Sequence, residues 1–305
     1  MNLHTIKETI ISYNPWTNVY GLARSIIGLA MLLTLIFNST NTLMIMPENV
    51  CNLTVPTAFC LVSDTGITFE LVRYVFIIIL LLVVIGWRPR ITGILHFYIA
   101  YSLHGNAILI DGGEHIASVI TFWLIPITLC DSRKWHWEKV NVIDKKYISK
   151  KLIPLIFFKF IEIQVAIIYI NAAIARLNNP EWVDGTALYY FLTDTLLGYL
   201  TYQAWILEPL LTSNIVAILT WGTTIIEFIL FAGFFASQKN KIYILTAGII
   251  LHLGIALVIG IVTFSMVMIG SLILYLYPKQ KHIEVNSIPF LKGGLTKRLI
   301  KRYDY

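Results

Sequence analysis

The sequence predicts an all-α, polytopic integral membrane protein with about eight transmembrane helices. Of its 305 residues, 57% are hydrophobic and 13% are charged, and its mean hydropathy is +0.74. An average soluble domain carries roughly 25% charged residues. Several apolar runs approach the ~20 residues that a helix needs to cross a ~30 Å hydrocarbon core, and they lack the strict alternation of a membrane β-barrel. The spans are therefore expected to be helices.

The first apolar run follows Asn14-Pro15-Trp16, where the proline favours a helix start and the tryptophan an interfacial anchor. No small-residue cleavage site follows it, so we expect this span to be retained. We expect one transmembrane domain over residues 1–278 and a basic cytoplasmic tail over 279–305. The predicted spans are residues 18–38, 71–87, 91–110, 115–130, 152–177, 213–236, 242–259 and 262–277.

Basic residues mark one side of the membrane. The positive-inside rule places the segments rich in lysine and arginine in the cytoplasm, together with both termini. Topology thus accounts for the net charge of +6, and no motif supports nucleic-acid binding. The basic segments are 88–90, 131–151, 237–241 and the tail, whereas 41–70, 111–114 and 178–212 contain neither lysine nor arginine.

The outer segment 178–212 is aromatic and apolar, but Asp194, Gly198 and Pro209 interrupt it. Such a segment is typical of an interfacial or partly re-entrant helix pair rather than of a span.

Two of the three cysteines, Cys51 and Cys60, lie nine residues apart in the predicted outer loop. This spacing allows a small-loop disulfide in an oxidising compartment, and the alternative is two free cysteines that act with a redox partner. Cys130 lies alone at the cytoplasmic end of the fourth span.

Ionisable residues inside spans are the first candidates for function. Inserting each one into the membrane costs about 2.5 to 3.5 kcal/mol, so such a residue usually faces a partner or a water-filled cavity. In the fifth span Lys159, Glu162, Tyr169 and Arg176 share one helix face, and Asn171 belongs to a second polar line. Lys159 and Glu162 can pair at i, i+3. One possibility is that these groups only hold neighbouring helices together, or that Lys159 and Arg176 extend to opposite membrane interfaces. The other is that they line a polar cavity with Arg176 at its outer mouth.

Glu227, in the middle of the sixth span, needs a cation or a proton. Arg24 or Lys159 is the expected partner, and the alternative is that Glu227 titrates as an acid or base. His252 and His96 are each either hydrogen-bonded interior histidines or functional groups. The catalytic candidates are therefore Glu227, His252, Lys159 and Glu162.

The stretch "IDGGEHI" predicts a helical hairpin with a glycine turn. Asp111, Glu114 and His115 either cap this hairpin or form an acidic outer rim for a cationic peptide. No metal-ligand spacing occurs, so no metal site is expected. The substrate-binding candidates are Arg176, Tyr169, Asn171, Trp182, Asp111, Glu114 and His104.

Four segments of the chain, taken in order, point to a known family: "NPWTNVYGLARSIIGLAMLLTLIFNST", "VVIGWRPRITGILHFYIAYS", "ILIDGGEHIASVITFWLIPITLCDSRKWHW" and "IYINAAIARLNNPEWVDGTALYYFLTD". Together they resemble the sporulation-delaying protein B (SdpB) family of bacterial membrane proteins, which belongs to the HTTM group. The resemblance implies a cell-membrane factor. It would mature or export a secreted peptide toxin with a small partner of the sporulation-delaying protein A type.

The HTTM group also includes vitamin K-dependent gamma-carboxylase, which resembles this chain mainly in spans five to seven. Where the carboxylase has two lysines, one of them its base, this chain has Ala175 and Arg176. Arginine stays protonated, which argues against vitamin K-type chemistry. The sequence leaves open whether the protein binds a quinone or a lipid. The remaining alternatives are a quinone-linked thiol oxidant, an acid/base enzyme, or an immunity or transport protein.

Overall fold

The computed structural model describes residues 13–43, 55–62, 66–108, 112–139, 148–195, 197–280 and 282–283, and the regular secondary structure of these residues is helical. The long helices are α2 (Asn18–Phe37), α4 (Gly66–Ile85), α5 (Pro89–Asn106), α6 (Gly113–Leu129), α7 (Ile148–Leu177), α11 (Ile215–Ala232), α12 (Gln238–Val258) and α13 (Val262–Leu276). The short ones are α3 (Thr40–Leu43), η2 (Ala58–Leu61), α8 (Pro180–Val183), α9 (Ala187–Thr193), η4 (Thr201–Gln203) and α10 (Ala204–Leu211).

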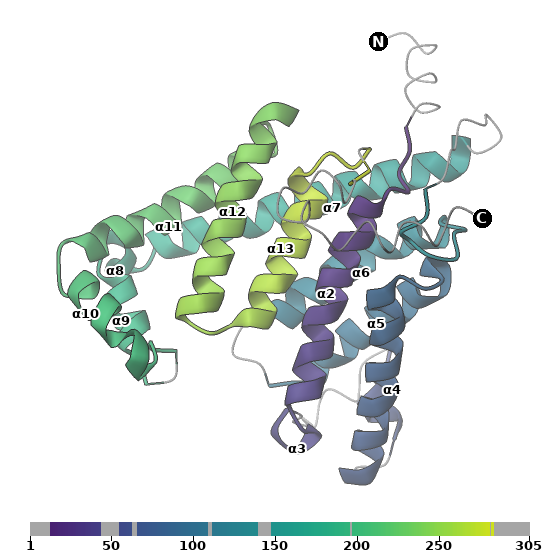
Figure 1. Ribbon diagram of the computed structural model, residues 1–305, viewed down its shortest axis with the longest axis horizontal. Coiled ribbons are helices and arrows are strands. Elements are labelled where there is room, and N and C mark those ends of the chain that lie inside the picture. The colour runs from purple at the N-terminus through teal and green to yellow at the C-terminus, as the bar shows by residue number, and fades with distance from the viewer. Residues whose placement is uncertain are drawn as a thin grey trace, which may run out of the picture.

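Helix α7, with 30 residues, runs along the length of the molecule, and α11 follows its C-terminal part (Figure 1). Helices α12, α13 and α2 cross in front of α7, while α8, α9 and α10 gather where α7 ends. Helix α13 packs on both α2 and α12, and its residues from Met268 to Leu276 are almost all buried. Gly270 permits the close approach to α2, because a Cβ there would lie 2.7 Å from Ile27 Cγ1.

Five of these helices are long and apolar enough to cross a membrane: α2, α4, α11, α12 and residues Lys150–Leu177 of α7. Helices α6 and α13 are apolar but have only 17 and 15 residues. Helix α5 carries Arg90, His96, His104 and Asn106, which lower its hydropathy. The chain is thus a multi-pass helical membrane protein, and the finer count of eight spans stays a prediction. The outer segment 178–212 folds, in its described part, as short helices and not as a span.

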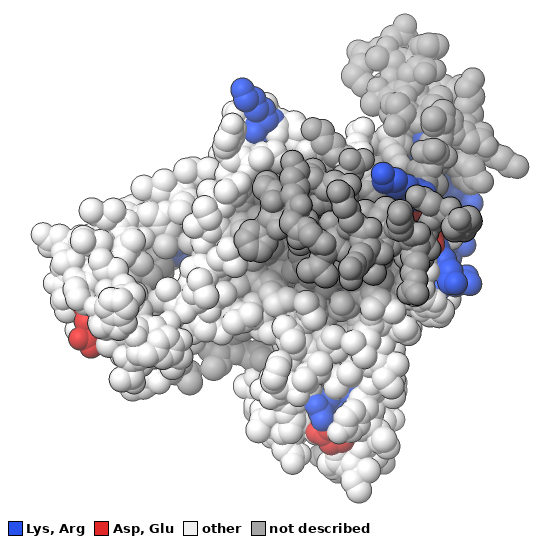
Figure 2. Space-filling view, viewed as in Figure 1, with Lys and Arg blue, Asp and Glu red and all other residues white. Residues whose placement is uncertain are grey.

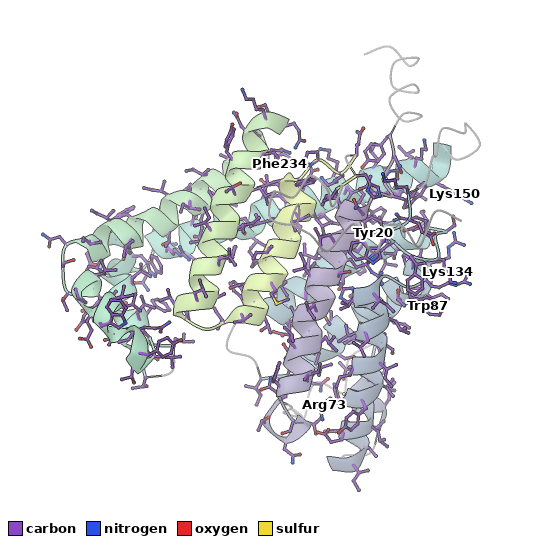
Figure 3. The ribbon with its side chains drawn as sticks, viewed as in Figure 1. Tyr20, Arg73, Trp87, Lys134, Lys150 and Phe234 are labelled. Carbon is purple, nitrogen blue, oxygen red and sulfur yellow. The ribbon has the colours of Figure 1, made fainter. Side chains whose placement is uncertain are left out.

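Basic segments that are far apart in the sequence meet at one end of the bundle. Thr17 donates a hydrogen bond to the carbonyl of Lys279 (2.6 Å), and the side chain of Asn18 exchanges hydrogen bonds with the backbone of Ile283 (2.7 Å). Figure 3 shows Tyr20, Trp87, Lys134 and Lys150 at this same end. These basic segments thus lie on one side of the bundle, and the assignment of that side to the cytoplasm stays a prediction.

A buried polar network fixes the loop after α6 at this end. Arg24, with no exposed surface, donates to Thr92 Oγ1 (2.6 Å) and lies 3.5 Å from His136 Nδ1. Ser25 Oγ lies 3.2 Å from the other ring nitrogen of His136. Asp131 accepts a hydrogen bond from Tyr20, so a permanent cation and a carboxylate are both held inside the protein.

The protonation of His136 follows from this burial. Desolvation, followed by the positive charges of Arg24 and Arg133, lowers the pKa of His136 from its usual value to about 2. The imidazole is therefore neutral at neutral pH, so Nδ1 can accept a hydrogen bond from Arg24, while the Ser25 hydroxyl donates to the carbonyl of Val84 (2.7 Å).

The opposite end of the bundle is closed by polar and aromatic contacts. Glu70 accepts hydrogen bonds from the backbone and hydroxyl of Thr40 (2.9 and 2.7 Å) and pairs with Arg73 (2.7 Å). Phe59, fully buried, packs edge-to-face on Phe69 with the ring centroids 5.6 Å apart. Helix α4 begins at Gly66, five residues before the predicted 71, and therefore includes Glu70.

Two of the three cysteines lie in the described part of the chain. Cys130 is a free thiol, and Cys60 is disulfide-bonded. Cys51 lies outside the described residues, so the pairing of Cys51 with Cys60 stays a prediction.

Charge is sparse on the described surface. In the view of Figure 2 the part of that surface to the left of the grey atoms is almost entirely white, with few lysine, arginine, aspartate or glutamate side chains. Such a surface suits contact with lipid acyl chains, since charged side chains are costly there.

Candidate functional site

The site lies where α7 ends and the chain turns into α8. Arg176 occupies the last turn of α7, where the helix dipole favours a cation. Asn179 caps α8 by accepting a hydrogen bond from the backbone of Glu181 (3.0 Å), and Pro180 takes the first helical position. Gly185 then adopts φ +86° and lies against Ala217 of α11, an approach that a side chain would prevent. The local sequence thereby places α8 over the end of α7.

Arg176 forms an ion pair with Glu227 of α11, with Nη2 and Oε1 2.9 Å apart. Its other terminal nitrogen donates to Thr223 Oγ1 (3.1 Å), and its guanidinium carbon lies 4.2 Å from the centre of the Trp182 ring. The expectation that Arg24 or Lys159 pairs with Glu227 is wrong, because Arg24 is engaged at the other end of the bundle. The ion pair joins the two long helices and the turn between them.

A second polar pair crosses from α7 to α12. Tyr169 Oη and His252 Nε2 are 2.9 Å apart, and the two side chains are 2% and 3% exposed. Phe264 packs edge-to-face on the His252 ring at 5.9 Å between centroids. If the tyrosine donates to Nε2, then the proton of the neutral imidazole is on Nδ1.

Both pairs line one cavity of about 530 Å³ between α7, α11, α12 and α13, with α8 and α9 at its edge. Its walls are mainly apolar side chains, so the polar groups are few and fixed in position, as in typical ligand pockets. The principal lining residues are Ile168, Tyr169, Ala172, Ala175, Arg176, Trp182, Phe191, Thr223, Glu227, His252, Ile255, Phe264 and Met268.

Two buried polar atoms of this cavity have no hydrogen-bond partner within the described part of the chain. They are Glu227 Oε2 and His252 Nδ1. Leaving a buried polar group unsatisfied costs about 1–3 kcal/mol, so each is a position where a ligand group or a water is favoured. One is an acceptor, and the other is a donor in the tautomer described above.

The polar face of α7 does not line one continuous cavity. Lys159 and Glu162 form the expected i, i+3 pair at 2.7 Å, but they line a separate cavity toward the N-terminal part of α7, together with Lys279. The four catalytic candidates are thus divided between two places, with Glu227 and His252 in one and Lys159 and Glu162 in the other. Asn171 is exposed and lines neither cavity.

The helical hairpin before α6 is only partly described. Glu114 is buried and accepts a long hydrogen bond from Thr34 (3.5 Å), so it lies inside the bundle and not on an outer rim. His104 stacks on His115 with the ring centroids 4.5 Å apart. Asp111 lies outside the described residues. Among the described residues no group of three histidine, cysteine or carboxylate side chains is arranged to hold a metal ion.

Several lining residues were not predicted from the sequence. Thr223 lies four residues before Glu227, so helix periodicity could have placed it on the same face. Phe191 and Phe264 reach the cavity from α9 and α13, and no local pattern indicates that.

The described residues thus form a multi-pass helical membrane bundle, and its candidate site is a mainly apolar cavity with a few fixed polar groups. The chain belongs to the HTTM family, whose domain model matches residues 17–279. It is 46% identical to Sporulation-delaying protein SdpB of Bacillus subtilis (strain 168) over 287 residues, which cover 93% of this chain and 88% of that protein. It is 44% identical to the uncharacterized protein YitO of the same strain over 294 residues, 94% of each chain. No solved structure matches.

Proposed function

We propose that this chain is a cell-membrane factor that matures or exports a secreted peptide toxin of the sporulation-delaying type, together with a small partner protein. The proposal is supported by similarity to SdpB over nearly the whole chain. In this proposal both termini are cytoplasmic and the turn containing α8 faces outward.

The cavity beside α8 is the proposed site for the toxin precursor. A peptide carries a donor and an acceptor at each residue, and these match the unpartnered Glu227 Oε2 and His252 Nδ1. Apolar side chains of the peptide would meet the apolar walls. Arg176, permanently charged and one-fifth exposed, would position a carboxylate or a backbone carbonyl. The observation that carries the proposal is that these two polar atoms lack hydrogen-bond partners among the described residues and lie in a mainly apolar cavity.

The first test is mass spectrometry of the secreted peptide made with and without this protein. Deletion should abolish the mature toxin while the precursor accumulates, and normal amounts of mature peptide would contradict the proposal. The mass also identifies the step, since cleavage, oxidation and carboxylation shift it differently.

Two variants then test the cavity itself. Glu227→Gln should lower the yield of mature toxin at equal expression. It weakens the pairing with Arg176, and it replaces a carboxylate, which only accepts hydrogen bonds, by an amide with one acceptor oxygen and one donor nitrogen. Glu181→Gln makes the same chemical change at an exposed position of α8 and should leave the yield unchanged. Equal yields from both variants would remove the cavity from the proposal.

A membrane enzyme is the second candidate, favoured by the Tyr169–His252 hydrogen bond beside Glu227. Two titratable groups that line one cavity can act as acid and base. His252→Gln keeps a hydrogen-bonding side chain but removes the titrating ring. If precursor still binds this variant while its conversion stops, the enzyme is favoured, and full conversion at normal expression would exclude it.

A further inference from the structure

The second cavity, at the end of the bundle where the basic segments meet, contains an excess of positive charge. It measures about 500 Å³ and lies between the N-terminal part of α7, the start of α12 and the segment after α13. Lys159, Lys241 and Lys279 line it, and Glu162 is its only acidic lining residue in the described part of the chain.

Glu162 already uses both carboxylate oxygens. One accepts from Lys159 (2.7 Å) and the other from Lys279, and the Glu162 side chain is only 6% exposed. Lys241 pairs with no carboxylate in the part of the chain that the structure describes, and its ammonium lies 6.0 Å from the centre of the Tyr275 ring. Three lysine side chains and one carboxylate therefore line the cavity.

The same excess appears in the titration of Lys279, whose side chain is 11% exposed. Burial lowers the pKa of Lys279, Glu162 opposes this effect, and the charges of Lys159 and Lys241 lower it further. An anion in the cavity would relieve this repulsion.

The surroundings select the kind of anion. Phe158 and Leu155 give the cavity an apolar wall, and Tyr13, Tyr277 and the glutamine side chains of residues 238 and 280 add polar groups. On the neighbouring surfaces of α7 and α12, Ile153, Ile156 and Tyr243 are exposed. Basic pockets between transmembrane helices at the cytoplasmic side suit the phosphate groups of anionic lipids.

We propose that this cavity binds a phosphate group, with Lys241 as its principal free cation and Lys159 and Lys279 as its flanking charges. The phosphate belongs either to the headgroup of an anionic lipid or to a small soluble phosphate compound. This site goes beyond the proposed function, because it lies apart from the Arg176–Glu227 cavity and stands whatever that cavity binds.

The test uses the purified full-length protein and native mass spectrometry. Phosphatidylglycerol, phosphatidylcholine and inorganic phosphate are offered separately to the wild type and to Lys241→Gln. Lys239→Gln is the matched control, since it removes the same charge from an exposed position two residues away on α12, outside the cavity. Loss of one lysine should weaken binding about fivefold, the equivalent of about 1 kcal/mol.

Two results support the proposal and distinguish the source. Preferential retention of phosphatidylglycerol that falls in Lys241→Gln and not in Lys239→Gln indicates a lipid headgroup. Binding of inorganic phosphate that displaces phosphatidylglycerol, with the same dependence on Lys241, indicates a soluble phosphate. Equal retention of both lipids without phosphate binding, or equal behaviour of the two variants, overturns the proposal.

Discussion

Breaking the Arg176–Glu227 pair should cost unequal amounts of stability depending on which partner is removed. The Glu227 side chain is 8% exposed and that of Arg176 is 22% exposed. Removing one partner of a buried ion pair costs about 3–5 kcal/mol, because the other charge is left uncompensated. Arg176→Gln leaves the more buried charge alone, and we place its cost at about 3 kcal/mol, the lower end of that range, because the site is partly open.

The reverse change should cost less. In Glu227→Gln, the guanidinium keeps Thr223 (3.1 Å) and the Trp182 ring (4.2 Å), so we expect a loss of about 1.5 kcal/mol, the value of one hydrogen bond to a charged group. The double variant should be more stable than Arg176→Gln alone, since no unpaired charge remains.

The free energy of unfolding of each variant can be measured in mixed micelles by denaturing-detergent titration, with tryptophan fluorescence as the probe. Lys239→Gln and Glu181→Gln remove one positive and one negative charge from exposed positions and should change stability by less than about 0.5 kcal/mol. The reasoning would be refuted if Glu227→Gln were as costly as Arg176→Gln. Additive losses in the double variant would refute it as well.

Three further changes test the rest of the fold. His136 is protonated near pH 6.5 in the unfolded chain but only near pH 2 in the folded chain. Its contribution to the free energy of unfolding is therefore complete above pH 6.5 and falls on acidification, by about 2.7 kcal/mol at pH 4.5. In His136→Asn this part of the pH dependence of unfolding should disappear. Asp131→Asn leaves the Arg133 guanidinium buried without its carboxylate and should lower the free energy of unfolding by about 3 kcal/mol. Glu138→Gln on the same loop should have little effect. Equal losses in the two variants would contradict a stabilising role for the Asp131–Arg133 pair. Gly270→Val inserts a side chain between α13 and α2 and should cost about 1–3 kcal/mol in the same titration, so an unchanged value would mean that the helices are not in close contact.

Local pattern was enough to place most helices. The apolar runs predicted spans at 18–38 and 262–277, and the structure has helices at Asn18–Phe37 and Val262–Leu276. Helical periodicity also predicted the pairing of Lys159 with Glu162, because both residues lie on one turn of α7. These features depend on residues that are close together in the sequence, so they can be predicted from a single sequence.

Contacts between distant segments could not be predicted in the same way. Arg176 and Glu227 lie on different helices, and the two cations that the sequence suggested as partners of Glu227, Arg24 and Lys159, both pair elsewhere. Lys279 was expected in a cytoplasmic tail, yet it folds back on Glu162. Such partners are set by how the helices pack, and packing is not encoded in the period of a single helix.

The central claim is that the cavity beside α8 receives the toxin precursor, and site-specific photo-crosslinking in cells tests it most directly. Phe191 and its neighbour Tyr190 are both exposed, but only Phe191 lines the cavity. A photoreactive phenylalanine at position 191 should capture the precursor, and the same group at position 190 should not. Capture at both positions alike, or none at 191 while mature toxin is still made, would contradict the account.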